Sequence, residues 1–420
     1  MHIHLARWIV TPERPPIENG GIVTFGGRIV AVDSAATLRS HYHGTVTDHG
    51  DAIICPPLVN AHCHLELSQL DYKLKPASPG PGSFTSWVKT LIALREQEDP
   101  NRWGSAIEDA VFQLLDNGVA VLGDVGNTDR VPLFIERAGR MWPFLGIFFQ
   151  EIISPMENDT LPLHLALDKD GIKPVAECLS DQSARPFYRA ISAHSPYTVA
   201  PSKIRAIDQW NRKRGLPFAI HLAESADETE FLRHGTGAIK ELMKDKGHYP
   251  PGWKIPGMSP VKYLDELGCL HHRTLCIHCV HIDEHDITLL SHRRASVCLC
   301  PRSNRFIGVG KPPAYAMYRA GINLALGTDS LASNRRLSIF SEMAELAHIS
   351  PDMPHEAIFQ AATIGGARAL GLQHITGSIE PGKAALFLVV QTRCKTQDET
   401  FESLVHQAHN GSIHITFVED

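Results

Sequence analysis

Pro56-Pro57-Leu58-Val59-Asn60-Ala61-His62-Cys63-His64 is an apolar run that ends on two histidines. Side chains alternate between the two faces of a β-strand, so His62 and His64 point the same way if the run is a strand. Two imidazoles on one face are a natural start for a site that binds Zn²⁺, Fe²⁺ or a similar divalent ion. The run therefore predicts a buried strand with a metal-binding end.

Spacing alone does not single out this pair, because histidine is frequent in the chain. There are 24 histidines in 420 residues, and the same H-x-H spacing recurs at His2/His4 and at His41/His43. Those two pairs lie in a region of short β-type runs, where we expect incidental histidines. The position of each pair relative to the predicted strands must therefore decide which of the three binds a metal.

The chain after His64 alternates short apolar runs with longer amphipathic stretches, which is typical of β/α units and a parallel sheet. The runs of strand type are Ala52–Asn60, Val119–Asp124, Pro143–Phe149, Arg189–His194, Pro217–His221, Thr274–His278, Ala295–Cys300 and Ile322–Leu326. The helical stretches between them include Phe84–Gln97, Trp103–Asn117, Asp227–Arg233, Ser338–His348 and His355–Leu370. Eight such units predict an α/β fold, a (β/α)8 barrel of the TIM type.

Both ends of the chain have a different pattern. Two β-rich runs surround Gly26-Gly27, which predicts a hairpin, and a turn at Gly377–Lys383 precedes an apolar run near the C-terminus. We expect residues 1–55 and 372–420 to pair into a small β-sandwich domain. Residues 56–371 would then form the catalytic barrel.

Composition excludes several classes of function. The net charge of −6 and the charged fraction of 20% give no electrostatic reason to bind nucleic acid or an anionic membrane. No apolar run is long enough for a transmembrane helix, and the N-terminus lacks the pattern of a secretory signal. Nine scattered cysteines, an odd number, favour reduced thiols in a cytoplasmic protein. A small molecule is the expected partner.

Polar, titratable residues recur at the ends of the predicted barrel strands. In such barrels the reactive side chains lie at the C-terminal ends of the strands. His194, His221 and His278 end the fourth, fifth and sixth strands, and Asp329 follows the eighth. A hydrogen-bonded core histidine explains any one of these residues but explains the whole set poorly. We therefore expect one shared site.

In their order along the chain, these motifs resemble those of the amidohydrolase superfamily. The matching motifs are Asn60–His64, His-Leu-Ala-Glu at 221–224, His-Cys-Val-His at 278–281, Cys-Pro-Arg-Ser-Asn at 300–304 and Gly-Thr-Asp at 327–329. The resemblance implies that one divalent ion, Zn²⁺ or Fe²⁺, is held by His62, His64, His221 and Asp329. Many binuclear members carry a bridging lysine at the end of strand four. This chain has none there, so a single ion is expected.

The resemblance also implies catalytic roles for three residues. Glu224 would be the proton shuttle, His278 a neutral partner of the water on the metal, and Asp329 an acceptor of that water's hydrogen bond. A carboxylic acid near the metal can protonate a ring nitrogen and later the departing amine, which describes hydrolytic deamination of an aminopurine. The alternatives are a helix-capping carboxylate for Glu224 and a core histidine for His278.

A closer resemblance is to the aminodeoxyfutalosine deaminases. It rests on His64-Leu65-Glu66-Leu67-Ser68, Ser83–Val88, Gln150–Ile153, Cys300–Asn304 and Thr328–Asn334. It implies conversion of 6-amino-6-deoxyfutalosine to futalosine and ammonia in menaquinone biosynthesis. It also implies substrate contacts, which would come from Glu66, Trp87, Glu151, His194, Arg302 and Asn304. A homodimer is expected at the level of the family.

Three other functions stay open at this point. The first is deamination of S-adenosylhomocysteine, methylthioadenosine or adenosine. The second is hydrolysis of an s-triazine C–N or C–Cl bond, against which Glu224 argues because such chlorohydrolases often replace the glutamate shuttle. The third is a degenerate barrel that only binds a ligand, which metal content would exclude.

Overall fold

The computed structural model of the protein describes residues 1–80, 82–138, 144–158, 187–391, 394–406 and 413–417. Its larger sheet has eight strands, hydrogen-bonded in chain order from β6 to β13, and all the strand pairs in it are parallel. The strands are β6 (Leu58–Cys63), β7 (Val119–Gly126), β8 (Leu145–Ile152), β9 (Phe187–Ala193), β10 (Phe218–Leu222), β11 (Thr274–His278), β12 (Ser296–Leu299) and β13 (Asn323–Leu326). The first strand and the segment after the last one meet where Cys63, the last residue of β6, forms a parallel bridge with Asp329. The predicted TIM-type barrel is confirmed.

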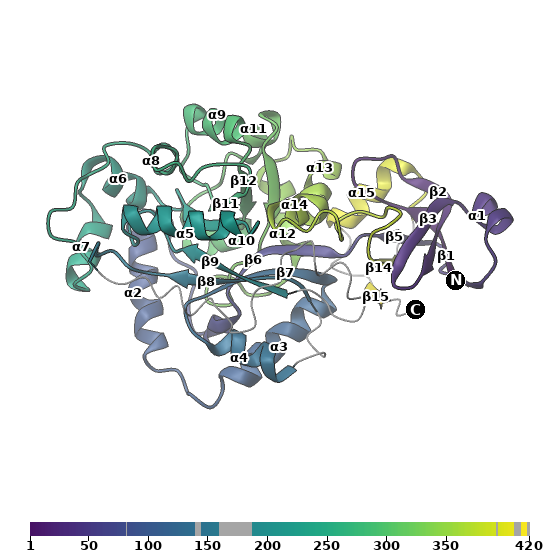
Figure 1. Ribbon diagram of the computed structural model, residues 1–420, viewed down its shortest axis with the longest axis horizontal. Coiled ribbons are helices and arrows are strands. Elements are labelled where there is room, and N and C mark those ends of the chain that lie inside the picture. Colours follow the sequence, from purple (N-terminus) through teal and green to yellow (C-terminus); the bar gives the residue numbers. More distant parts are fainter. Residues whose placement is uncertain (81, 139–143, 159–186, 392–393, 407–412, 418–420) are drawn as a thin grey trace.

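Helices surround this barrel (Figure 1). They are α2 (Ser83–Arg95), α3 (Trp103–Asp116), α4 (Arg130–Ala138), α5 (Pro201–Lys213), α6 (Ala226–His234), α7 (Ala238–Asp245), α8 (Pro260–Glu266), α9 (Glu284–Arg293), α10 (Pro301–Ile307), α11 (Ala314–Arg319), α12 (Ile339–Ile349), α13 (His355–Gln360) and α14 (Gly366–Ala369). A 3-10 helix (Leu65–Leu70) follows β6. Among the described residues, no helix is long and apolar enough to cross a membrane.

The long helix predicted at His355–Leu370 is interrupted. A π-helical turn over Ala361–Gly365 separates α13 from α14. A Cβ atom on Gly365 would lie 2.0 Å from the backbone oxygen of Leu324, in strand β13. Glycine at this position therefore lets the helical segment lie directly against the barrel.

The strand predicted at Ala52–Asn60 is wrong as a single element. Strand β5 (Ala52–Cys55) belongs to the second sheet, and β6 begins the barrel at Leu58. Pro56 and Pro57 separate the two strands because proline has no backbone N–H for a sheet ladder. The start of the strand predicted at Pro143 lies outside the described residues.

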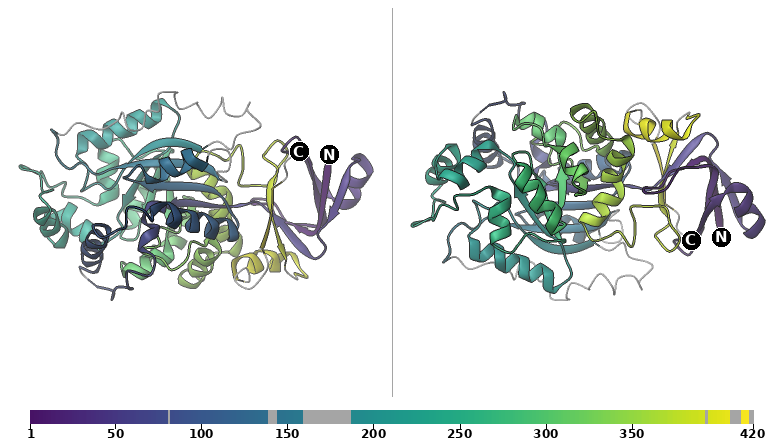
Figure 2. Two further views of the ribbon diagram at one scale, coloured as in Figure 1. Left: turned by 90° about the horizontal axis from the view of Figure 1, so that it is seen from below. Right: turned by 90° about the horizontal axis from the view of Figure 1, so that it is seen from above.

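Both ends of the chain form the second sheet, which lies beside the barrel (Figure 2). It is a mixed sheet in the order β15-β14-β5-β1-β2-β3, with β4 paired to β1. The strands not yet given are β1 (His2–Ile9), β2 (Ile17–Phe25), β3 (Arg28–Ser34), β4 (Thr45–Asp48), β14 (Leu386–Gln391) and β15 (Ile413–Phe417). Two helices, α1 (Ala35–His41) and α15 (Gln397–His406), belong to the same terminal segments. The expectation that the two ends form a separate β structure is confirmed; the boundaries at 55/56 and 371/372 stay our proposal.

The predicted hairpin is also confirmed. Strands β2 and β3 pair antiparallel, with Phe25 opposite Arg28. The two residues between them, Gly26 and Gly27, have φ of 56° and 68°. Positive φ at both central positions is the geometry of a tight two-residue hairpin turn, which glycine adopts without steric cost.

Candidate active site

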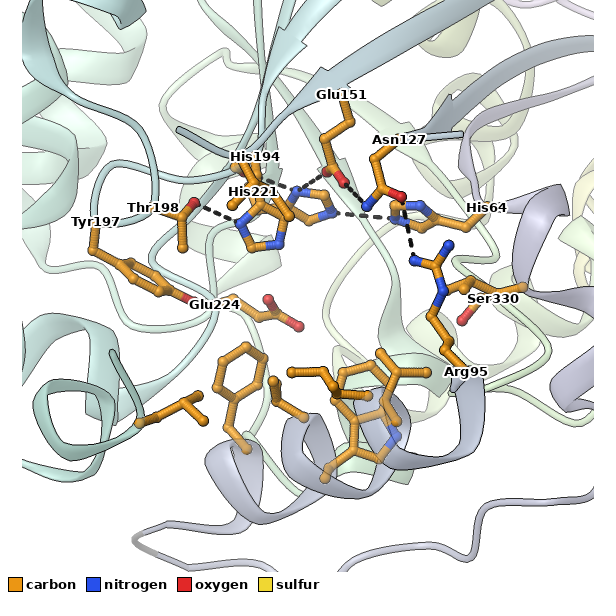
Figure 3. Close-up of a pocket in the computed structure, with 18 of the residues that line it drawn as sticks. His64, Arg95, Asn127, Glu151, His194, Tyr197, Thr198, His221, Glu224 and Ser330 are labelled. Atoms are coloured by element: carbon orange, nitrogen blue, oxygen red, sulfur yellow. Dashed lines mark hydrogen bonds and ion pairs between the residues drawn. The ribbon is translucent and has the colours of Figure 1, made fainter. Parts of the chain in front are cut away.

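A cavity of about 330 Å³ lies where the barrel strands end. Its size is that of a small-molecule site. The residues in its lining that follow or end strands are His64, Asn127, Glu151, His194, His221, Glu224, His278 and Asp329, and helices α2 and α7 supply an apolar wall. Figure 3 shows the side chains of His64, His194, His221 and Glu224 directed into this space.

The four expected metal ligands lie next to one another. The Nε2 atoms of His62 and His64 are 3.8 and 3.9 Å from Oδ1 of Asp329. The Nε2 atom of His64 is also 3.4 Å from Nε2 of His221. The ligand atoms of His62, His64 and Asp329 all lie within 4.8 Å of one another, which is close enough for one ion to bind all three.

His62 provides a test of whether this group fits a metal. Its side chain is completely buried, yet neither ring nitrogen has a hydrogen-bond partner among the described residues. Burial, and then the neighbouring histidines His64, His221 and His278, lower its pKa well below the usual value, which favours the neutral ring. A buried polar atom without a partner is costly, whereas a neutral imidazole nitrogen is a good ligand for Zn²⁺ or Fe²⁺. The donor set therefore fits a divalent cation.

Asp329 is held in one orientation by two hydroxyl groups. Ser303 Oγ and Ser333 Oγ donate to its Oδ2 atom at 2.6 and 2.9 Å. Its backbone has φ of 55°, a left-handed conformation that is rare for a non-glycine residue. These bonds occupy Oδ2 and leave Oδ1 facing the histidines.

Glu224 and His278 face each other at the other side of the group. Glu224 Oε1 lies 3.5 Å from His278 Nε2, and His278 Nδ1 is 2.9 Å from Asn304 Oδ1. The amide oxygen can only accept, so Nδ1 carries the hydrogen and Nε2 of the neutral ring presents a lone pair. Burial, and then the negative charges of Asp329 and Glu228, raise the pKa of Glu224 well above its usual value. The geometry thus places a carboxyl group that favours its protonated form beside a hydrogen-bond acceptor.

The six expected substrate contacts divide into two groups. Glu66, Trp87, Glu151 and His194 line the cavity. Arg302 does not line it, because its Nε atom donates to Asn334 at 3.1 Å and lies 3.7 Å from a carboxylate oxygen of Glu342. Asn304 lies behind His278 and contacts its ring rather than the cavity.

Glu66 is the most constrained of these residues. Its carboxylate accepts hydrogen bonds from the backbone amides of Asn127 and Thr128 at 3.2 and 2.9 Å, and from the hydroxyl of Thr128. Arg95 NH2 lies 3.3 Å from Oε1. These contacts fix the carboxylate in the cavity wall, two residues after His64.

Several residues of the cavity were not found by reasoning from the sequence. Arg95 is the last residue of α2, and from the sequence a basic residue at the end of a helix is expected to lie at the surface. Asn127 directly follows β7, so the strand-end rule could have selected it. Tyr197, Ser330 and Lys246 also line the cavity and carry no spacing signal of their own.

This fold and this group of histidines and carboxylates define a class of barrel hydrolases. The amidohydrolase family profile matches residues 53–420, and the chain belongs to this family. As a member it is a hydrolase that acts on carbon–nitrogen bonds.

Two curated relatives and one solved structure illustrate the similarity. The chain is 30% identical to a 5-methylthioadenosine/S-adenosylhomocysteine deaminase of Nitratidesulfovibrio vulgaris, over 98% of this chain and 88% of that protein. It is 27% identical to the aminodeoxyfutalosine deaminase of Deinococcus radiodurans, over 84% of this chain and 81% of that protein. A crystal structure of an adenosine deaminase from Xanthomonas campestris with bound zinc has the same fold, with a TM-score of 0.77 and 23% identity over 99% of this chain and 91% of that one.

Proposed function

We propose that this protein is a metal-dependent hydrolytic deaminase of an adenine-containing nucleoside, and that its substrate is 6-amino-6-deoxyfutalosine. The observation that carries the first part is the position of Glu224, whose carboxyl group lies in the cavity beside His278 and the proposed metal ligands. The names of the relatives support the same chemistry, since those quoted above are all deaminases of adenine compounds.

The proposed cofactor is a single Zn²⁺ or Fe²⁺ ion held by His62, His64, His221 and Asp329. Three imidazole nitrogens and a carboxylate oxygen are donors that suit either ion. Strand β9 leads into His194 rather than into a lysine that could bridge two ions, which supports one ion. When bound, such a cation supplies a water molecule of lowered pKa for attack on the ring.

The protein side chains then move the protons. Glu224 donates a proton to the ring nitrogen next to the amino-bearing carbon, then takes one proton from the attacking water and passes it to the departing amine. It takes the second proton of that water as the carbonyl forms, so Glu224 is protonated again at the end of the cycle. His278 accepts a hydrogen bond at Nε2 and keeps the water in line, while Asn304 holds its ring in the required tautomer. In balance, the oxygen of one water replaces the amino group, the C–N bond breaks, and ammonia leaves.

The wall of the cavity supports a nucleoside that carries an apolar substituent. Phe84, Trp87, Val88 and Leu91 of α2 line it, together with Met243 of α7. Aromatic and aliphatic side chains of this kind bind an apolar group by excluding water.

A cation at the edge of this wall supports a substituent that ends in a carboxylate. Lys246 lines the same cavity and is exposed to solvent. Aminodeoxyfutalosine offers both an aromatic ring and a carboxylate, whereas methylthioadenosine offers only the apolar part. Glu66 and His194 would bind the polar groups of the nucleoside itself.

Deamination of S-adenosylhomocysteine or methylthioadenosine is the second candidate, favoured by the 30% identical relative. The experiment that separates the two compares ammonia release from aminodeoxyfutalosine, S-adenosylhomocysteine, methylthioadenosine, adenosine and guanine. We expect the highest kcat/KM for aminodeoxyfutalosine. A large preference for another adenine nucleoside would contradict aminodeoxyfutalosine as the substrate but would still support hydrolytic deamination. If none of these compounds released ammonia, the proposed function would be rejected.

Two further parts of the proposal concern the protein as a whole. Seven of the described cysteines, all except Cys394, are buried thiols without a disulfide, which suits a reducing cytoplasm. The homodimer that the family resemblance implies stays a prediction, which light scattering on the purified protein tests.

A further inference from the structure

We propose that Glu228 is a positioning residue that fixes the proton-transfer carboxyl of Glu224 by clamping the backbone that carries it. The role of Glu224 in this inference rests on the function proposed above. Glu228 itself does not line the cavity. Its side chain binds the backbone of the turn between strand β10 and helix α6, and this turn contains Glu224.

The clamp consists of two hydrogen bonds to adjacent backbone amides. The amide of Ala223 donates to Oε1 of Glu228 at 3.0 Å, and the amide of Glu224 donates to Oε2 at 2.9 Å. Ser225 caps α6 by accepting from the Glu228 amide at 3.2 Å. In an ordinary capping box the acidic side chain in this position returns to the amide of the cap residue. Here it reaches past Ser225 and binds the two residues before it.

The clamped turn also joins two strand ends. The carbonyl of Ala223 accepts from the amides of Val280 and His281, both at 2.9 Å. These residues lie two and three positions after His278, which is the last residue of β11 and has φ of 75°. The amide of Ala223 is therefore held by Glu228, and its carbonyl is held by the strand end that carries His278. The backbone bonds therefore connect the segments that carry Glu224 and His278, whose Oε1 and Nε2 atoms are 3.5 Å apart.

The conformation of the turn requires such a restraint. Ala223 has φ of 52°, a left-handed conformation that is unfavourable for a non-glycine residue and persists only when its surroundings enforce it. Glu228 is 2% exposed and has no Lys, Arg or His within ion-pair distance among the described residues. Burial of a carboxylate is unfavourable, and an exposed side chain can cap a helix equally well, so capping alone does not explain why Glu228 is buried. The two amides account for its burial.

The first test is the variant Glu228→Gln. Glutamine keeps the shape but places an NH2 group against one of the two amides, so one bond of the clamp is lost. We expect kcat for ammonia release to fall by about ten- to hundredfold with KM changed little, because a small displacement of a catalytic group costs rate rather than binding. The matched control is Glu230→Gln on the same helix, whose exposed side chain accepts a hydrogen bond from the hydroxyl of Thr236. This control is expected to retain full activity and metal.

A double-mutant cycle separates positioning from a general loss of structure. If Glu228 acts through Glu224, adding Glu228→Gln to Glu224→Gln lowers the remaining activity by less than threefold. Full additivity of the two losses would overturn the proposal. If Glu228→Gln does not accumulate as folded protein, Glu228→Asp is measured in its place. Its carboxylate is too short to reach both amides, so the same pattern is expected.

A readout independent of activity keeps this inference distinct from the proposed function. Hydrogen–deuterium exchange should quicken at the amides of Ala223 and Glu224 in Glu228→Gln and stay unchanged there in Glu230→Gln. Unchanged exchange in Glu228→Gln would reject the clamp even if the protein is a deaminase. If exchange is faster in Glu228→Gln but the wild type releases no ammonia from any nucleoside, the clamp by Glu228 is supported and the proposed function is rejected.

Discussion

The backbone amide of Asp329 donates a hydrogen bond to the carbonyl oxygen of His62 at 3.1 Å. The bond joins the segment after the last barrel strand to the first strand, at the point where both carry expected metal ligands. Closure of the barrel therefore brings the expected metal ligands of its first and last strands together. Residues more than two hundred and sixty positions apart are brought together by strand order alone.

The first prediction concerns metal content. His62→Ala should lose the bound ion, because it removes an expected ligand whose buried ring nitrogens have no hydrogen-bond partner in the described part of the chain. His2→Ala is the control, since it removes a histidine of another H-x-H pair that lies in the terminal sheet. Elemental analysis should find about one equivalent of Zn or Fe in the wild type and in His2→Ala, and little in His62→Ala. Two equivalents in the wild type would contradict the single-ion site.

The position of the strand ends could be predicted from the sequence, and with it most of this site. His221 and Asp329 could be selected because reactive residues of a barrel lie at one edge, and Glu224 was implied by the resemblance to the amidohydrolase superfamily. The two strands around Pro56-Pro57 were merged, because both are apolar and the pattern does not show that the chain changes sheets between them. Arg302 turned to Asn334 and Glu342 instead of the cavity, and no spacing rule gives the direction of such a long side chain. The clamp by Glu228 depends on a left-handed alanine, which the sequence does not reveal.

The second prediction concerns the tautomer of His278. Asn304→Leu has nearly the same size but no acceptor for the hydrogen on Nδ1. We expect kcat to fall by about tenfold or more, as expected when a general-base or orienting histidine loses its partner, while metal content stays the same. Activity equal to the wild type would show that the ring is oriented by something else.

The third prediction concerns stability at low pH. Burial, followed by the charges of His2 and His49, lowers the pKa of His4 to about 4. The unfolded chain then binds more protons than the folded one between pH 6.5 and 4, so the free energy of unfolding decreases as the pH falls through this window. His4→Leu should make Tm depend less on pH between 6.5 and 4. An identical slope in the variant and the wild type would exclude His4 as a source of the acid sensitivity.

The fourth prediction concerns the edge of the cavity. Lys246→Gln should lower kcat/KM for aminodeoxyfutalosine and S-adenosylhomocysteine, which carry a carboxylate, and should leave methylthioadenosine unaffected. The effect should be a few-fold and should weaken as salt is added, because an exposed charge is screened. Lys244→Gln, an exposed lysine of α7 that pairs with Glu241, is the control. An equal loss for all three substrates would remove Lys246 from carboxylate recognition.

The central claim is that Glu224 transfers the protons of a hydrolytic deamination. The most direct measurement is ammonia release by purified Glu224→Gln, with metal content determined on the same sample and Glu230→Gln assayed beside it. Glutamine keeps the shape of the side chain but cannot shuttle a proton, so we predict about one equivalent of metal and a loss of about 10²- to 10⁴-fold in kcat. Turnover near that of the wild type, with the metal retained, would contradict the account.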